Sequence, residues 1–105
     1  MTNKTEKISK MISERVHQID PDAEVYLFGS RARGDENIDS DWDLLILTLN
    51  SVSLQEEQKF RHHLIPLELI TGEAFSTFVF EKKDWETRHR ITPFYKNITK
   101  ELIQI

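Results

Sequence analysis

The chain has 105 residues, 38% of them hydrophobic and 30% charged, which is the size and composition of a single globular domain. Its formal net charge of −4 disfavours tight non-specific binding to nucleic acid, which depends on many phosphate-neutralising lysines and arginines. The absence of cysteine excludes disulfides and thiolate zinc sites. No apolar run is long enough for a signal segment or a membrane span, so we expect a cytoplasmic protein with no membrane partner.

In the first half of the chain, the pattern of apolar residues predicts helices alternating with strands. Helical spacing predicts a helix over residues 5–20, and a short β-prone run predicts a strand over residues 24–28. The polar stretch 31–39 predicts a helical turn followed by a loop. The strongly apolar run 43–49 predicts a strand that is buried on both faces.

The second long helix is marked by its capping residues. Ser53 to Glu56 have the spacing of a capping box, so we expect a helix to begin there. Pro66 lies inside this helix and is expected to kink or restart it, because proline cannot donate the backbone hydrogen bond of a helix interior. Gly72 is the expected stop.

The last third of the chain adds one strand and more helix. A β-prone run predicts a third strand over residues 75–80, residues 82–87 predict a helical turn, and Pro93 predicts the start of a last helix that carries Leu102. The order of elements predicts an α+β (α/β-like) fold. We expect one domain over residues 1–105, with a mixed sheet of at least three strands flanked by helices.

Two carboxylates precede the apolar second strand. Asp41 and Asp43 occupy alternate positions of an extended segment, so their side chains face the same side while Trp42 faces the other. Hard divalent cations such as Mg²⁺ prefer oxygen ligands, and two carboxylates on one face can bridge a pair of ions roughly 3.5–4 Å apart. Without a cation the two charges repel each other. Taken alone, the pair also fits a solvated turn before a strand.

A Gly-Ser pair follows the first predicted strand. Gly29 leaves the backbone open to a phosphate, Ser30 offers a hydroxyl donor, and a helical turn over residues 31–33 would present N–H groups to an anion. Taken alone, the pair fits an ordinary turn at the end of a strand. Ten residues separate Ser30 from Asp41, and together the two pairs predict a phosphate site beside a metal site.

The combined motif resembles a known family. Gly29-Ser30-Arg31-Ala32-Arg33-Gly34 followed by Ser40-Asp41-Trp42-Asp43 is similar to the signature of the minimal nucleotidyltransferases, members of the DNA polymerase β-like superfamily. The resemblance implies a single small nucleotidyltransferase domain. It also implies that a hydroxyl acceptor attacks the α-phosphate of a nucleotide, most simply transferring AMP from ATP, with pyrophosphate leaving.

The same resemblance assigns roles to the motif residues. Gly29 and Ser30 would hold the triphosphate of ATP or another NTP. Asp41 and Asp43 would be the catalytic carboxylates and bind Mg²⁺, as two ions when nucleotide is bound. Arg33 would contact the phosphate or, alternatively, pair with an acidic neighbour and fix the loop.

The resemblance breaks at the third strand. Catalytic members of the family usually carry a third carboxylate there, but residues 75–80 contain no Asp or Glu. Ser76 is the polar residue nearest the expected place, and Glu68 and Glu73 are the nearest acids. Two functions therefore stay open: a nucleotidyltransferase, whose base a partner chain would supply if needed, or a catalytically weak or inactive module that binds nucleotide and partner.

Partners follow from the resemblance and from the length. Small bacterial members of the family commonly pair with HEPN (higher eukaryote and prokaryote nucleotide-binding) proteins in toxin–antitoxin modules, so a HEPN-type protein is the expected partner and its side chain the acceptor. A chain this short cannot enclose a large substrate, which also leaves self-association open. Small-molecule modification, as by aminoglycoside nucleotidyltransferases, is disfavoured because those enzymes usually carry an additional domain.

Overall fold

The computed structural model describes residues 2–105. The elements, in chain order, are α1 (Asn3–Ile19), β1 (Glu24–Phe28), α2 (Ser30–Arg33), β2 (Trp42–Thr48), α3 (Leu54–Thr71), β3 (Phe75–Glu81), α4 (Lys82–Thr87), the 3-10 helix η1 (Arg88–Ile91), α5 (Pro93–Ile98) and β4 (Ile103–Gln104). Within these residues, no helix is long and apolar enough to cross a bilayer.

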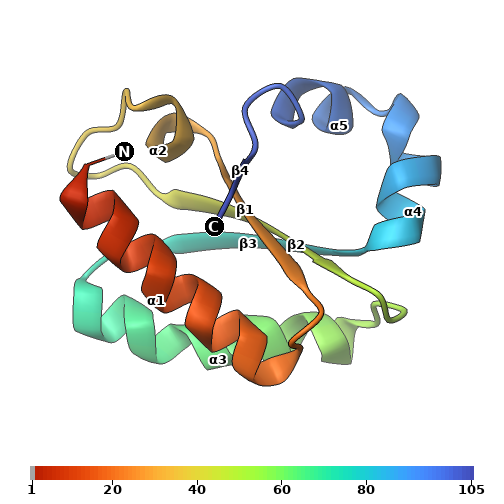
Figure 1. Ribbon diagram of the computed structural model, residues 1–105, viewed down its shortest axis with the longest axis horizontal. Coiled ribbons are helices and arrows are strands. Elements are labelled where there is room, and N and C mark those ends of the chain that lie inside the picture. Colours follow the sequence, from red (N-terminus) through yellow and green to blue (C-terminus); the bar gives the residue numbers. More distant parts are fainter. Residues whose placement is uncertain (1) are drawn as a thin grey trace.

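The strands form one mixed sheet in the order β3-β2-β1-β4 (Figure 1). β1 is antiparallel to both β2 and β4, whereas β2 and β3 run parallel. The α+β fold with a mixed sheet and flanking helices, predicted from the sequence, is therefore confirmed. Because β1 and β2 are antiparallel, the end of β1 lies beside the beginning of β2.

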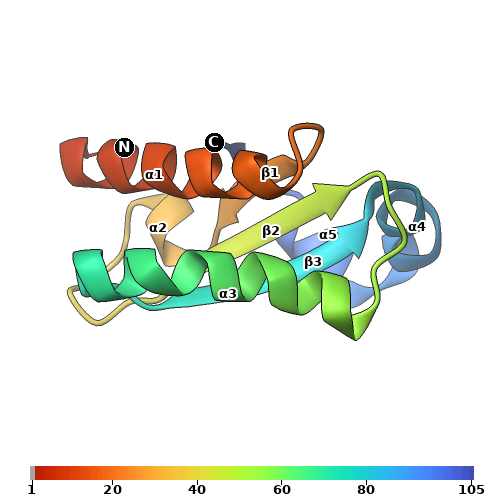
Figure 2. The same cartoon turned by 90° about the horizontal axis from the view of Figure 1, so that it is seen from below.

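One face of the sheet is covered by the two long helices. Figure 2 shows α1 and α3 side by side against this face. Their apolar faces meet alternate residues of the strands, which is the packing that helical and strand periodicities predict. The buried residues of this cluster are Ile8, Ile12, Val16, Ala23, Val25, Leu27, Trp42, Leu44, Ile46, Phe60, Leu64, Leu67 and Val79.

The opposite face is covered by α4 and α5, and Phe94 of α5 packs against Phe28 at the end of β1. The buried residues of this second cluster are Phe28, Leu45, Leu47, Trp85 and Ile98. Apolar residues of β2 thus contribute to both clusters, as expected for a strand buried on both faces. β2 ends at Thr48, and Leu49 is exposed. Asp43 projects from the same face, beside Phe28.

The long helices begin and end where their caps predict. The Ser53 hydroxyl accepts a hydrogen bond from the Glu56 N–H at 3.2 Å, and Gly72 takes a left-handed conformation after α3. α3 continues through Pro66 as one helix, so of the two expected effects of this proline, a kink or a restart, the restart does not occur. The buried side chains of Leu64 and Leu67 on either side of Pro66 anchor the helix to the sheet.

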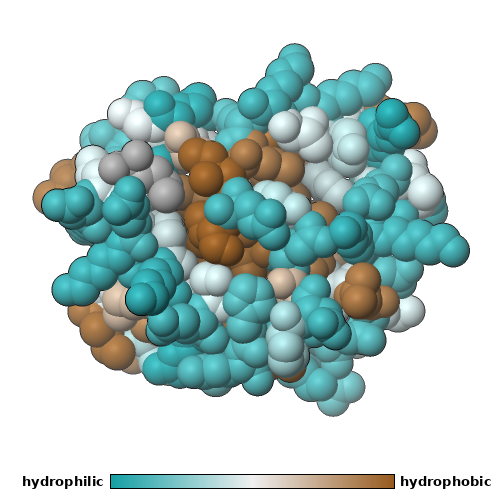
Figure 3. All heavy atoms as spheres, viewed as in Figure 1, coloured by the Kyte–Doolittle hydropathy of each residue, from teal (hydrophilic) through white to brown (hydrophobic). Residues whose placement is uncertain are grey.

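The C-terminal segment differs most from the prediction. α5 ends at Ile98, and the chain turns back so that β4 pairs with β1, although a helix extending to Leu102 is predicted. The Ile105 N–H donates to the Val25 carbonyl at 2.9 Å, and the Ile105 side chain packs against the core. Pairing with β1 satisfies backbone groups that the free edge of β1 would otherwise expose. In Figure 3, apolar atoms gather at the centre of the face where this segment ends, within a hydrophilic rim.

Candidate functional site

The motif residues meet at one end of the sheet. Phe28, the last residue of β1, is the register partner of Asp43 on β2, and Asp43 is the register partner of Ser76 on β3. Residues that are paired across strands project from the same face. The end of β1 and the beginnings of β2 and β3 therefore present Gly29, Asp43 and Ser76 to one region.

Gly29 and Asp43 are in direct contact. Gly29 has φ 76° and ψ −157°, a backbone conformation that is accessible essentially only to glycine. A Cβ atom at this position would lie 2.1 Å from Asp43 Oδ2, well inside van der Waals contact. The backbone conformation thus requires glycine here, and a larger residue would also displace the Asp43 carboxylate. The Gly29-Ser30 pair of the motif therefore adjoins Asp43.

The two aspartates differ in their surroundings. Asp43 is partly buried, Asp41 is exposed, and Trp42 between them is fully buried against α1 and α3, as the alternation of strand residues predicts. Burial raises the pKa of Asp43 above its ordinary value of 3.8, and the negative charges of Asp41 and Glu101 raise it further against the opposing effect of Arg33. The site therefore carries an excess of negative charge, which a bound cation would neutralise.

Asp41 and Asp43 fit the ligand chemistry of Mg²⁺. Their carboxylate oxygens are hard donors, and Mg²⁺ typically takes one or two protein carboxylates while the phosphates of a nucleotide and water complete its shell. Among residues 2–105, no group of three or more His, Asp and Glu side chains is arranged as a metal site. Asp41 and Asp43 therefore fit a cation whose remaining ligands are phosphate and water oxygens.

Glu101 is a site residue that the sequence does not reveal. Its Oε1 accepts a hydrogen bond from the Gly29 N–H at 3.2 Å, and its Oε2 lies 2.9 Å from Arg33 Nη1, which donates to it. Arg33 also pairs with Asp35 at 3.2 Å, so the predicted pairing of Arg33 with an acidic neighbour is present. The sequence places Glu101 inside a final helix, and only the turn after α5 brings it to the motif.

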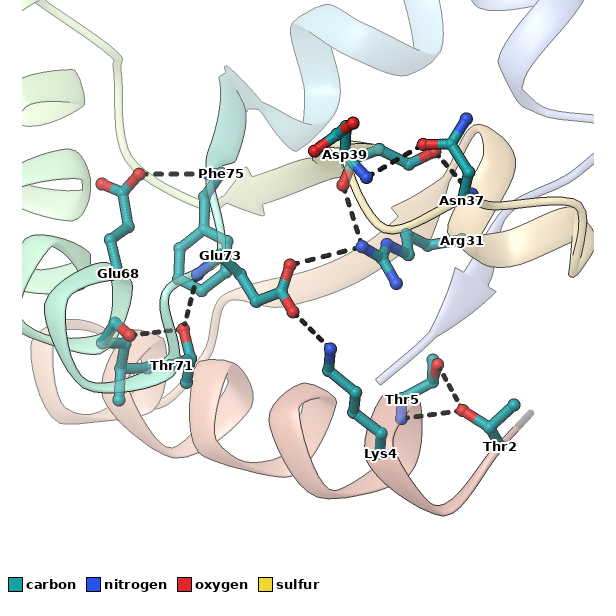
Figure 4. A network of polar contacts seen from close by, with 12 residues as sticks. Thr2, Lys4, Thr5, Arg31, Asn37, Asp39, Glu68, Thr71, Glu73 and Phe75 are labelled. Atoms are coloured by element: carbon teal, nitrogen blue, oxygen red, sulfur yellow. Dashed lines mark hydrogen bonds and ion pairs between the residues drawn. The ribbon is translucent and has the colours of Figure 1, made fainter.

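Arg31 fixes the loop that separates the two halves of the motif (Figure 4). Its guanidinium is buried, lies over the Trp42 ring at 5.1 Å, and donates to the Ser40 carbonyl at 3.0 Å. It also pairs with Glu73 at 3.3 Å, and Glu73 accepts from Lys4 of α1 at 2.7 Å. The buried arginine therefore ties the beginning of the loop to its end and to α1.

The two acids considered near the third strand are engaged away from Asp43. Glu73 is held by Lys4 and Arg31, and the hydrogen bond from Lys4 is the main cause of its lowered pKa. Glu68 accepts a hydrogen bond from the Phe75 N–H at 3.2 Å. On β3, the residue paired with Asp43 is Ser76, so a hydroxyl stands where a third carboxylate is expected.

The family follows from the sequence as a whole. Residues 9–103 match the family model of the nucleotidyltransferase domain, and the chain belongs to this family. No curated protein matches the chain at a significant level.

Solved structures share the fold. A protein assigned as a nucleotidyltransferase from Sulfolobus solfataricus is 24% identical with a TM-score of 0.61, over 93% of this chain and 76% of the other. A protein assigned as a minimal nucleotidyltransferase is 20% identical with a TM-score of 0.64, over 96% and 95% of the two chains. A toxin–antitoxin structure with AMP-PNP is 15% identical with a TM-score of 0.64, over 91% and 70%.

The contact between Gly29 and Asp43 predicts an unequal effect of two glycine substitutions. Gly34 has φ 79° and open space around its missing Cβ, so Gly34→Ala introduces only left-handed backbone strain, about 1–2 kcal/mol. Gly29→Ala adds the clash with Asp43, and we expect a loss of about 3 kcal/mol or more in the free energy of unfolding. Urea denaturation of both variants measures the difference, and equal losses would contradict the contact.

The raised pKa of Asp43 predicts the pH dependence of stability. Below about pH 3.8 this carboxyl is protonated in both the folded and the unfolded chain, and its ionisation weakens the fold as the pH rises through the higher folded pKa. We therefore expect Asp43→Asn to raise the free energy of unfolding at about pH 7 and to leave it nearly unchanged at about pH 3. Asp39→Asn, on the exposed loop, is the matched control. A less stable Asp43→Asn protein at neutral pH would refute the expectation.

Proposed function

We propose that this protein transfers a nucleoside monophosphate, most simply AMP from ATP, to a hydroxyl group on a partner protein. The observation that carries the proposal is the contact between Gly29 and Asp43, which joins a turn suited to phosphate to a pair of carboxylates suited to Mg²⁺. Membership of the nucleotidyltransferase family supports the reaction. We also propose that residues 1–105 act as one nucleotidyltransferase domain, supported by the match over residues 9–103.

Each motif residue has a role in the proposed reaction. The Gly29 N–H, the Ser30 hydroxyl and the Arg33 guanidinium would hold the triphosphate. Asp41 and Asp43 would hold Mg²⁺, which, when bound, neutralises phosphate charge and favours ionisation of the acceptor hydroxyl. The acceptor oxygen bonds to the α-phosphorus as the bond to pyrophosphate breaks in line. The acceptor proton passes to solvent or to a group of the partner, because the residue of β3 beside Asp43 is Ser76, whose hydroxyl is a weak base, and Glu81 of β3 lies at the other end of the strand beside Thr48.

Two observations support a protein as the acceptor: a groove beside Ser76, and the toxin–antitoxin structures of similar fold. A groove of about 580 Å³ runs along the free edge of β3 beside Ser76, with Arg61, His62, Glu68 and Phe78 among its lining residues. The groove lies between α3 and β3 and meets the proposed site only at Ser76, because Gly29, Ser30, Asp41 and Asp43 do not line it. It therefore offers a surface next to the site to which a large partner would bind. Structures of similar fold include the toxin–antitoxin pair MntA–HpeT, 14% identical with a TM-score of 0.66 over 91% of this chain and 70% of the other. We propose a protein partner on this basis, and a HEPN-type protein because the motif resembles that of family members that pair with HEPN proteins.

The second candidate function is a binding module that holds nucleotide and partner without turnover. Ser76 is the observation that favours it, because a hydroxyl is a weaker base and a poorer metal ligand than a carboxylate. The two candidates share the same binding residues. They differ only in whether a covalent bond to the acceptor is formed.

Labelled ATP separates the two functions. The protein, Mg²⁺ and ATP labelled at the α-phosphate are incubated with the product of the neighbouring gene, and we expect the label on that protein. The Asp41→Asn/Asp43→Asn double variant should abolish labelling, whereas Asp39→Asn should retain it. A tight complex of the two proteins that never acquires label would refute the transferase function and support the binding module.

Restoring the third carboxylate tests the role of β3. Ser76 is paired with Asp43 and projects from the same face, so Ser76→Asp places an acid where a base and metal ligand would act. We expect the initial rate of label transfer to rise by about tenfold or more, since general base catalysis contributes about 10²–10⁴. Ser76→Asn has the same shape without the charge and should not accelerate transfer. An unchanged rate in Ser76→Asp would show that the chain or its partner already supplies the base.

A further inference from the structure

The Glu101 carboxylate occupies two of the donors that the proposed function assigns to phosphate. One oxygen accepts from the Gly29 N–H at 3.2 Å and the other from Arg33 Nη1 at 2.9 Å. A planar carboxylate that bridges a backbone N–H and a guanidinium uses the same geometry with which these groups bind a phosphate. Neither donor can serve a phosphate fully while Glu101 holds it.

The position of Glu101 is electrostatically costly. Its charge lies near enough to Asp43 to repel it, in a site that already contains Asp41. Arg33 is the cation that offsets this charge, and Arg33 is shared with Asp35. The contact therefore persists through its two hydrogen bonds, one of which is also the ion pair with Arg33, while the neighbouring carboxylates act to weaken it.

The backbone around Glu101 stays anchored when its side chain moves. The Glu101 N–H donates to the Ile98 carbonyl at 3.0 Å, and the residues that follow pair with β1 through Tyr26↔Gln104 and Leu27↔Ile103. The side chain is about one quarter exposed, at 23%, so it borders solvent into which it can rotate. Releasing the donors thus requires rotation about side-chain bonds only, with β4 still in place.

We propose that Glu101 is a displaceable carboxylate that closes the phosphate site when no nucleotide is bound and must swing out before a triphosphate enters. The proposal rests on the proposed function, because it concerns the same phosphate donors. Its consequence is a lowered apparent affinity for nucleotide, since only the fraction of molecules with Glu101 released can bind. A partner that held Glu101 away would raise that affinity without touching the nucleotide.

Two substitutions at Glu101 distinguish displacement from simple repulsion. Glu101→Ala removes the carboxylate, whereas Glu101→Asp retains the charge but is one methylene shorter and cannot reach both donors. Isothermal titration with inorganic triphosphate and with a non-hydrolysable ATP analogue, each with Mg²⁺, should show binding about five- to tenfold tighter for both variants than for the original chain. Glu14→Ala, on the exposed side of α1, removes an equal charge and should leave the affinity unchanged.

Each other result has a distinct meaning. Tighter binding by Glu101→Ala alone would overturn displacement in favour of repulsion, and weaker binding by both would show that Glu101 merely positions Gly29 and Arg33. Unchanged binding in both variants would overturn the proposal while nucleotide binding stands. If the variants bind triphosphate more tightly but no protein binds the ATP analogue, the displaceable carboxylate is supported and the proposed function fails. No binding of either ligand by any protein would overturn both.

Discussion

The Asp43 carboxylate rests against the backbone of Gly29, and the site is arranged around this contact. It exists because Phe28 and Asp43 are register partners in an antiparallel pair, which places the turn after β1 beside the first residues of β2. The room for the carboxylate comes from the missing side chain of Gly29, in a conformation reserved for glycine. The residues that we propose as phosphate donors and metal ligands are therefore brought together by strand register and by one absent Cβ.

Most of the helices and strands, and the side to which Asp41 and Asp43 point, could be predicted from the sequence because they depend on local patterns. The alternation around Trp42 placed Asp41 and Asp43 on one side, and the burial of Trp42 on the other face bears this out. Ser53 and Gly72 bounded α3 through capping chemistry that acts within one turn of helix. The family motif itself spans a single turn, one loop and the start of a strand.

What the sequence did not reveal depends on contacts between distant residues. β4 pairs with the edge of β1 that would otherwise be free, and no sequence pattern near Ile103 predicts a strand there. Glu101 reaches Gly29 and Arg33 only because α5 stops early for that pairing. The buried Arg31 likewise depends on Glu73, which approaches from the segment between α3 and β3. The sequence did not reveal β4, the position of Glu101 or the burial of Arg31, because each depends on contacts between residues far apart in the chain. Glu101 and Arg31 both contact residues of the motif.

The order of these contacts along the chain divides the site into two parts with different folding demands. Gly29 and Arg33 lie in the connection between β1 and β2, and Asp43 lies at the start of β2, so the proposed site for phosphate and cation closes a short loop of chain at a small cost in entropy. Ser76 and Glu101 come from more distant parts of the chain, the parallel strand β3 and the segment before β4. We therefore expect substitutions at these two positions to alter the proposed site while the pairing of β1 with β2 is kept.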